Sequence, residues 1–120
     1  MIVGIGVDVV DLARFERAVG RTPGLRDRLF AESERSLPLR SLAGRFAAKE
    51  ALMKALGTAD GLVWVDIAVV STDGGAPTFA LSGSTAASVE ARGIDVLHLS
   101  MSHDAGVAIA YVIAESRETA

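Results

Sequence analysis

Apolar residues alternate with small or polar residues at the start of the chain, which predicts a β-strand over 2–8. One face of this strand carries branched apolar side chains, and the other carries Gly4, Gly6 and then Asp8. Because glycine has no Cβ, the glycine face allows another backbone or a ligand to come close. The carboxylate of Asp8 is therefore expected at the end of the strand, beside a bare surface.

A second pattern, over 42–56, predicts a helix that is apolar almost all the way round. Within 46–54 the charged residues are Lys49, Glu50 and Lys54. Charged groups are costly in a core unless they are paired or bind something charged. Glu50 and Lys54 are four residues apart and share a helix face, whereas Lys49 lies about 100° away from Glu50 around the axis. The pattern fits either a structural ion pair or a ligand site.

Capping and turn residues divide the rest of the chain into short elements. Asp11 suits the N-cap of a helix over 11–19, Gly20 and Pro23 end that helix, and Gly57 suits the C′ position of the central helix. The other predicted elements are a short helix near 24–36 ended by Pro38, a strand-like segment over 62–70, a turn at 73–75, a return strand over 77–81, a helix over 85–92 capped by Ser84 and closed by Gly93, and a hairpin of strands 96–102 and 106–114 joined by 103–105. Strands and helices do not alternate regularly, which predicts an α+β fold with a mainly antiparallel sheet packed on a long central helix.

Composition narrows the class of protein. The length of 120 residues predicts one domain over 1–120, and 50% of the residues are hydrophobic. A domain of this size cannot bury that much apolar surface in its own core. We therefore expect subunit interfaces that bury the rest. No apolar run approaches the ~20 residues of a membrane span. No basic n-region precedes an apolar h-region, so we expect no secretory signal. Cysteine is absent, which excludes thiolate metal sites and cysteine nucleophiles and fits a cytoplasmic protein.

The formal net charge of −3 hides a local excess of positive charge. Eight of the twelve basic residues are arginines in one early third of the chain: Arg14, Arg17, Arg21, Arg26, Arg28, Arg35, Arg40 and Arg45. A basic surface on an acidic protein favours a specific acidic partner, although an ordinary solvated helix face has the same pattern. Nucleic acid is a poorer fit, because the pI is about 5.3 and aromatic residues are only 5% of the chain.

Familiar nucleotide and hydrolase motifs do not explain the chain. Gly4 and Gly6 lie inside the strand and lack the third glycine of a dinucleotide-binding turn, and no P-loop or nucleophile elbow is present. His98 lies mid-strand and is expected to be structural or on the surface. His103 lies next to Asp104, where it can contact a phosphate, move protons or stabilise a turn.

The carboxylates of Asp8 and Glu50 suggest a metal site if the fold brings them together. Mg²⁺ typically uses one or two protein carboxylates, several waters and the phosphates of a substrate. Two other classes of protein fit the same residues. One is an oligomeric scaffold in which Glu50 and Lys54 pair, and the other is a metal-dependent phosphoesterase, although two-metal sites usually gather further carboxylates and histidines.

The two segments that contain Asp8 and Glu50 together resemble the small holo-acyl-carrier-protein synthases, a class of 4′-phosphopantetheinyl transferases. The matching segments run from Gly6 to Arg14 and from Gly44 to Thr58, with a weaker match from Leu99 to Asp104. The resemblance covers essentially the whole chain and implies the fold of these transferases. The chain departs from the family in a shorter stretch over 34–44, and in Ala76, where a basic residue often precedes the proline of the turn.

The resemblance implies a reaction. The phosphopantetheine arm of coenzyme A would move to a serine hydroxyl of an apo acyl carrier protein, releasing adenosine 3′,5′-bisphosphate. Asp8 and Glu50 would hold Mg²⁺, and Lys54 would donate to the phosphates. The general base stays open among a metal-bound water, Glu50 and His103, and Lys49 could salt-bridge a neighbour or touch the ligand.

The resemblance also implies partners and assembly. Arg45 and His103 would contact the phosphates of coenzyme A, and Gly57 would let the nucleotide approach the end of the helix. Arg14, Arg17 and Arg21 would meet the acidic carrier protein. The small members of the family form homotrimers with the site between protomers, so the chain is expected to be a cytoplasmic homotrimer of fatty acid and lipid metabolism.

Overall fold

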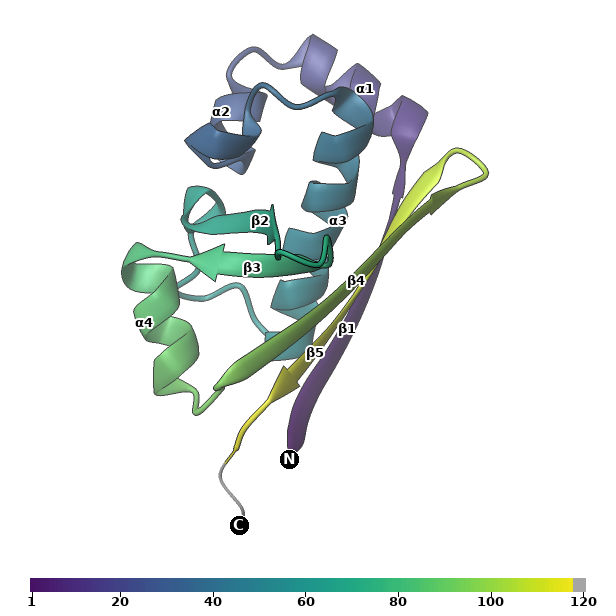
Figure 1. The fold of residues 1–120 in the computed structure, drawn as a ribbon. Helices are drawn as coiled ribbons and strands as arrows, with labels where there is room; N and C mark the ends of the chain where they lie inside the picture. The colour runs from purple at the N-terminus through teal and green to yellow at the C-terminus, as the bar shows by residue number, and fades with distance from the viewer. Residues whose placement is uncertain (118–120) are drawn as a thin grey trace.

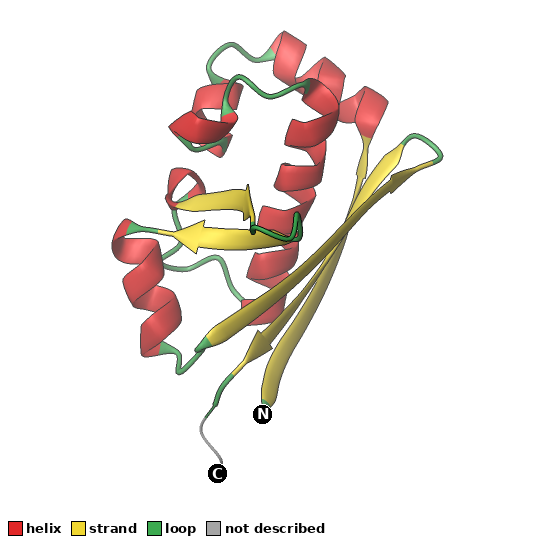
Figure 2. Cartoon of the chain, in the orientation of Figure 1, coloured by secondary structure: helices red, strands yellow, loops and turns green. Residues whose placement is uncertain are grey.

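A long helix, α3, lies between a three-stranded sheet on one side and smaller elements on the other (Figures 1 and 2). The computed structural model describes residues 1–117. Its elements are β1 (Ile2–Asp11), α1 (Leu12–Arg21), α2 (Leu25–Leu29), the 3₁₀ turn η1 (Glu32–Glu34), α3 (Leu39–Leu56), the 3₁₀ turn η2 (Trp64–Asp66), β2 (Ile67–Ser71), β3 (Pro77–Leu81), α4 (Gly83–Ala91), β4 (Val96–Asp104) and β5 (Val107–Glu115). Within the described residues, no helix is long and apolar enough to cross a membrane.

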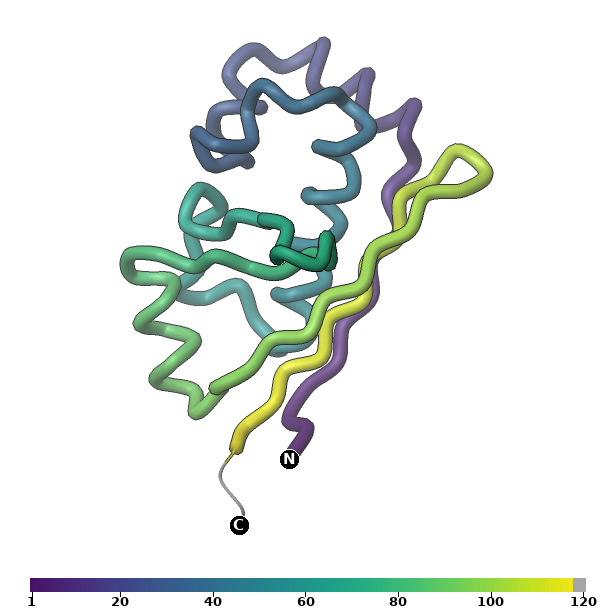
Figure 3. The backbone as a smooth tube through the Cα atoms, in the orientation of Figure 1, coloured from purple at the N-terminus to yellow at the C-terminus, as the bar shows by residue number. Residues whose placement is uncertain are grey.

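All strand pairings are antiparallel, which confirms the predicted α+β class. The larger sheet has the order β1-β5-β4, and β2 and β3 form a separate two-stranded sheet. β1 and β5 come from opposite ends of the chain and lie side by side, as the backbone tube shows (Figure 3). This pairing places Asp8, on the edge strand β1, opposite Ala110 on the central strand β5.

The glycine face of β1 packs against the backbone of α3. A Cβ at Gly4 would overlap the carbonyl oxygen of Ala55, and a Cβ at Gly6 would overlap that of Ala51. Small side chains on the facing helix and on β5 complete this close contact, among them the buried Ala47, Ala51, Ala55, Ala108, Ala110 and Ala114. Of the two uses predicted for the glycine face, the structure shows the approach of another backbone.

The other face of the same sheet is apolar and exposed. Ile5 is 64% exposed, Val9 58% and Tyr111 52%. Ile5 pairs with Ile113 and Val7 pairs with Tyr111, so the apolar side chains of β1 and β5 form one continuous patch. A patch of this kind on a small chain indicates a surface that another chain covers.

The first strand and the central helix differ from the predicted bounds. β1 continues to Asp11, so Asp8 lies inside the strand and not at its end. Asp11 is the N-cap of α1 as predicted, with its Oδ1 accepting from the Arg14 N–H at 2.8 Å. α3 begins at Leu39 because Pro38 serves as its N-cap, and it ends at Gly57, whose φ of 79° is the left-handed conformation expected there.

Two other predicted elements were wrong in extent, each because of a contact between residues distant in sequence. The helix over 24–36 is divided into α2 and η1, since Glu34 turns into the core to meet Lys49. The strand over 62–70 starts only at Ile67, because the Val63 N–H donates to Thr85 Oγ1 in place of a strand partner.

The last helix and the last hairpin are shifted by a few residues. α4 begins at Gly83, with Ser82 and not Ser84 at its N-cap, because the Ala86 N–H donates to the Ser82 carbonyl at 3.1 Å. The final turn is Ala105–Gly106, with φ values of 50° and 78°, so the segment 103–105 is not the loop and His103 belongs to β4. Positive φ at both central residues is typical of a tight two-residue hairpin turn.

Candidate active site

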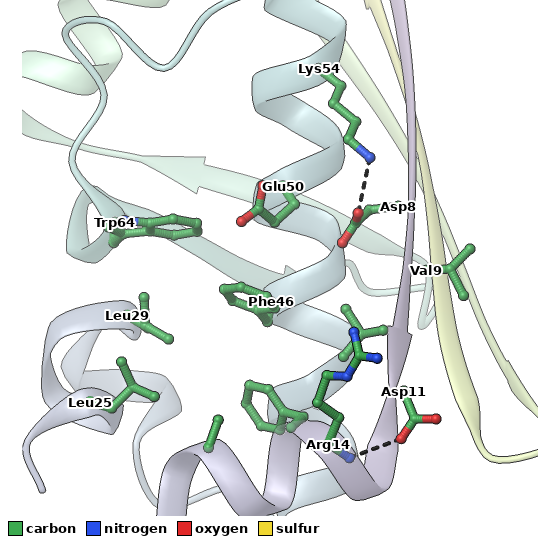
Figure 4. A pocket seen from close by; sticks show the side chains of 13 residues that line it. Asp8, Val9, Asp11, Arg14, Leu25, Leu29, Phe46, Glu50, Lys54 and Trp64 are labelled. Atoms are coloured by element: carbon green, nitrogen blue, oxygen red, sulfur yellow. Dashed lines mark hydrogen bonds and ion pairs between the residues drawn. The ribbon is translucent and has the colours of Figure 1, made fainter. Parts of the chain in front are cut away.

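A pocket of about 580 Å³ opens between β1, α1, α2, α3 and η2 (Figure 4). Asp8 from β1 and Glu50 and Lys54 from α3 line one side of it. The fold therefore brings together two segments more than forty positions apart, as the sequence required for a shared site. We call these three residues the charged side of the pocket; Asp11 and Arg14, where β1 meets α1, also line it.

Lys54 pairs with Asp8, not with Glu50. Its Nζ lies 3.1 Å from Asp8 Oδ1 and donates to the Val7 carbonyl at 3.1 Å. The Glu50–Lys54 ion pair considered from the sequence is not among the salt bridges of residues 1–117. The side chain of Lys54 is 55% exposed and that of Asp8 is 16% exposed, so the lysine can leave its partner for an incoming anion.

Burial raises the pKa of Glu50 above its usual range, and the nearby Asp8 carboxylate raises it further, while Lys54 acts in the opposite direction. A carboxylate whose ionisation is opposed by a neighbouring carboxylate lies where a cation is favoured. Their oxygens are the ligands that Mg²⁺ prefers. No group of three or more histidine, cysteine, aspartate or glutamate side chains gathers as a metal cluster in residues 1–117. Asp8 and Glu50 thus form a two-carboxylate site, which suits a metal that completes its shell with waters and phosphates.

The opposite side of the pocket is apolar. We call it the apolar wall, and its members are Phe15, Leu25, Leu29, Phe46 and Trp64. The Phe46 and Trp64 rings are stacked with centroids 5.5 Å apart, and Phe15 lies 5.7 Å from Phe46. A ligand in this pocket would have a charged group at the carboxylates and an apolar chain against the aromatic rings.

Lys49 points away from the pocket into a buried ion pair. Its Nζ lies 2.7 Å from Glu34 Oε1, and both side chains are at most 1% exposed. The Glu34 carboxylate also accepts from the Ala31 and Val69 N–H groups, each at 3.0 Å. Burial lowers the pKa of Lys49, and the hydrogen bond to Glu34 works against that shift. Of the two roles left open for Lys49, the structure shows the salt bridge.

Arg45 and His103 do not line this pocket. Arg45 Nε lies 3.6 Å from Glu34 Oε2, and its Nη1 donates to the Ser41 carbonyl at 3.5 Å. His103 packs against Gly44 on the sheet side of α3, where its Nε2–H donates to the Arg40 carbonyl at 3.1 Å. Gly57 ends α3 one turn beyond Lys54 and also lies outside the lining residues.

The three arginines of α1 are exposed, and they differ in their relation to the pocket. Arg14 lines it, extending from α1 toward Asp8 in Figure 4. Arg17 and Arg21 follow along the same exposed helix and are not lining residues. The basic helix α1 therefore borders the entrance to the carboxylates.

Sequence patterns missed Glu34 and the apolar wall. Glu34 lies in a segment of mixed charge, and nothing local indicates that its carboxylate is buried. Trp64 and Phe46 fit the apolar pattern of any core residue, so the sequence does not distinguish them as pocket residues. Their position in the pocket depends on how η2 packs against α3. The only signal that could have identified Glu34 is the unpaired Lys49 in an apolar helix, which requires a buried carboxylate somewhere in the fold.

The sequence and the fold are those of a known class of transferase. A family model for the 4′-phosphopantetheinyl transferase superfamily matches residues 4–112. The holo-[acyl-carrier-protein] synthase of Clavibacter michiganensis subsp. michiganensis is 61% identical over 115 residues, which are 96% of this chain and 97% of that protein. The chain belongs to this superfamily, in its group of holo-[acyl-carrier-protein] synthases, and is an enzyme of that class.

Solved structures of holo-[acyl-carrier-protein] synthases have a fold similar to that of this chain. The holo-[acyl-carrier-protein] synthase of Neisseria meningitidis superposes with a TM-score of 0.90 at 33% identity, covering 97% of this chain and 100% of that one. The corresponding Bacillus anthracis protein, solved in complex with coenzyme A (3′,5′-ADP), gives a TM-score of 0.78 at 36% identity, covering 97% and 98%. Coenzyme A is therefore a ligand of a protein with this fold.

Proposed function

We propose that this enzyme transfers the 4′-phosphopantetheine group of coenzyme A to a serine hydroxyl of an apo acyl carrier protein, with Mg²⁺, and releases adenosine 3′,5′-bisphosphate. The observation that carries the proposal is the pocket in which Asp8, Glu50 and Lys54 face an apolar wall. That arrangement suits a ligand with a pyrophosphate at one end and a long, partly apolar arm. Membership of the family supports the same assignment.

The residues of the charged side take distinct roles in this proposal. Asp8 and Glu50 hold the cation, which when bound neutralises charge on the pyrophosphate. Lys54 leaves its ion pair with Asp8 and donates to a phosphate oxygen instead. The serine oxygen then forms a bond to the phosphorus that carries pantetheine, the bridging P–O bond breaks, and the leaving bisphosphate keeps that bond's electrons. The serine proton goes to a base, for which Glu50 is a candidate inside the pocket.

Other contacts are proposed to come from a second chain. Arg45, Gly57 and His103 do not line the pocket of their own chain, and we assign them to the nucleotide of coenzyme A across a protomer interface. The exposed apolar face of β1 and β5 supports assembly, and the homotrimer is the state we propose. We place the enzyme in the cytoplasm, in fatty acid biosynthesis.

The raised pKa of Glu50 predicts how stability depends on pH without metal. A carboxyl with a raised folded-state pKa favours the folded state below its unfolded-state pKa, near 4.5, and loses that contribution as pH rises through the folded-state value. Glu50→Gln lacks this loss. In metal-free urea titrations, the stability of Glu50→Gln relative to wild type is expected to increase between pH 4 and neutrality and then stay constant. A pH-independent difference would contradict the assigned environment.

The basic helix α1 predicts a separate effect on the carrier protein. Arg14→Glu is expected to raise the KM for apo carrier protein by roughly tenfold or more and to change the KM for coenzyme A much less. Charge reversal at a docking surface acts on encounter, and the defect should shrink at high salt because exposed charges are then screened. Steady-state kinetics at two ionic strengths measure this. Equal changes in both KM values would place Arg14 at the nucleotide instead.

Release of adenosine 3′,5′-bisphosphate from coenzyme A tests the reaction against the two alternatives. The proposed transferase releases it only when both Mg²⁺ and apo carrier protein are present. A phosphoesterase would release it without the carrier protein, and a scaffold would not release it at all.

A further inference from the structure

One ammonium group connects α3 to the two segments that carry most of the apolar wall. Lys49 Nζ donates to the Leu29 carbonyl at 2.8 Å and to the Trp64 carbonyl at 3.4 Å, in addition to its bond with Glu34. Leu29 ends α2 and Trp64 begins η2, and the side chains of both line the pocket. Among the hydrogen bonds of residues 1–117, those from Lys49 are the ones that join α3 to α2 and η2.

The neighbouring residue on the same helix is Glu50. Consecutive helical residues point about 100° apart, so one turn of α3 directs Lys49 to the backbone behind the wall and Glu50 into the pocket. The same turn of α3 therefore connects Leu29 and Trp64 of the wall to the carboxylate of Glu50, and α3 packs on β1, which carries Asp8. The 4.8 Å contact of Lys49 Nζ with the Phe30 ring fixes the ammonium further.

Glu34 makes this arrangement possible. A buried ammonium needs a partner, and Glu34 supplies the carboxylate. Two backbone N–H groups donate to its oxygens, and the Arg45 Nε lies 3.6 Å from Oε2 as an ion pair. All three protons of the Lys49 ammonium face acceptors: one carboxylate and two carbonyls. Two of those three acceptors are the backbone carbonyls of Leu29 and Trp64, whose side chains belong to the apolar wall.

We propose that Lys49, held in place by Glu34, is a positioning residue that sets the distance between the apolar wall and the carboxylates. This inference rests on the proposed function: the wall would hold the pantetheine arm while the pyrophosphate lies at Asp8 and Glu50. A displacement of the wall by about 1 Å would misalign the phosphorus with the incoming serine, which can lower a rate by about 10²-fold.

The test uses the fluorescence of Trp64, the single tryptophan of the chain, as a direct report on the wall. Lys49→Met alone leaves Glu34 charged and buried, so the decisive variant is Glu34→Gln with Lys49→Met, which removes both charges together. The matched control is Val112→Ala. It opens a cavity in the fully buried core of β5, away from the residues that line the pocket.

The double variant is expected to fold, to shift the Trp64 emission to longer wavelength and to increase its quenching by acrylamide. Its kcat should fall roughly 10- to 100-fold, while the Mg²⁺ affinity stays within about threefold of wild type, because Asp8 and Glu50 are intact. The control should lose stability with unchanged Trp64 emission and kcat. A folded double variant with wild-type emission and kcat would overturn the proposal, as would one that fails to fold, since the pair would then serve folding.

Transfer by the wild-type enzyme and Trp64 emission in the double variant are separate measurements, so the function and the role of Lys49 are tested independently. If the wild-type enzyme transferred nothing to a carrier protein, the proposed function would be wrong, but the Trp64 emission would still report whether Lys49 sets the wall. If the wild type transferred normally and the wall did not move in the double variant, only the role of Lys49 would be wrong.

Discussion

Asp8→Asn and Glu50→Gln are each expected to lower kcat/KM for transfer by roughly 10²–10³-fold while the protein stays folded. Each change removes one of the two carboxylates that hold the cation, and a cation on a phosphoryl oxygen supplies several kcal/mol of charge stabilisation, at about 1.4 kcal/mol per tenfold in rate. Both variants keep the size and shape of the side chain, so packing of β1 on α3 is preserved. Steady-state kinetics across a Mg²⁺ titration measure the effect.

The control for this pair of variants is Glu90→Gln, which neutralises an exposed carboxylate on α4 outside the pocket. It should keep wild-type kinetics and Mg²⁺ dependence. Glu50→Gln should also be more stable than wild type at neutral pH without metal, so its inactivity cannot come from unfolding. Activity near the wild-type level in both Asp8→Asn and Glu50→Gln would remove the proposed metal site.

Ile5→Lys is expected to convert the assembly to monomers and to abolish transfer, although every residue of the pocket is unchanged. Ile5 is 64% exposed on the apolar face of β1, next to Ile113 on β5, and a lysine there would bury an unpaired charge in any interface that covers the face. Sedimentation equilibrium should give a mass near three times 12.5 kDa for wild type and near 12.5 kDa for the variant.

Ala87→Lys serves as the matched control, because it places the same charge on the exposed surface of α4, outside the sheet face. This variant should keep both the assembly and the activity. A monomeric Ile5→Lys protein that transfers at the wild-type rate would show that one chain holds a complete site. A wild-type protein that is itself monomeric and active at assay concentration would contradict the proposed trimer.

Features that depend on neighbours along the chain were predictable from the sequence. The Asp11 N-cap and the Gly57 helix end are examples, because their hydrogen bonds or backbone angles are local. The glycine face of β1 also predicted a close approach, which α3 makes. Asp8 and Glu50 could be chosen as site candidates because a carboxylate within an apolar segment is costly unless it is paired or binds something charged.

Features that depend on distant partners were not predictable. Lys54 shares a helix face with Glu50, but its partner is Asp8, and only the packing of α3 on β1 decides that choice. The predicted helix over 24–36 was interrupted for a similar reason, since Glu34 is buried and pairs with Lys49 of α3. The Trp64 side of the pocket depends on the same long-range contacts.

Intact-mass spectrometry of an apo acyl carrier protein, after incubation with this enzyme, coenzyme A and Mg²⁺, tests the proposed transfer directly. The carrier protein is expected to gain the mass of one phosphopantetheine group, located on one serine. The increase should disappear when Mg²⁺ is chelated or when Glu50→Gln replaces the wild type. An unchanged carrier-protein mass in the presence of folded enzyme, Mg²⁺ and intact coenzyme A would contradict the proposed transfer.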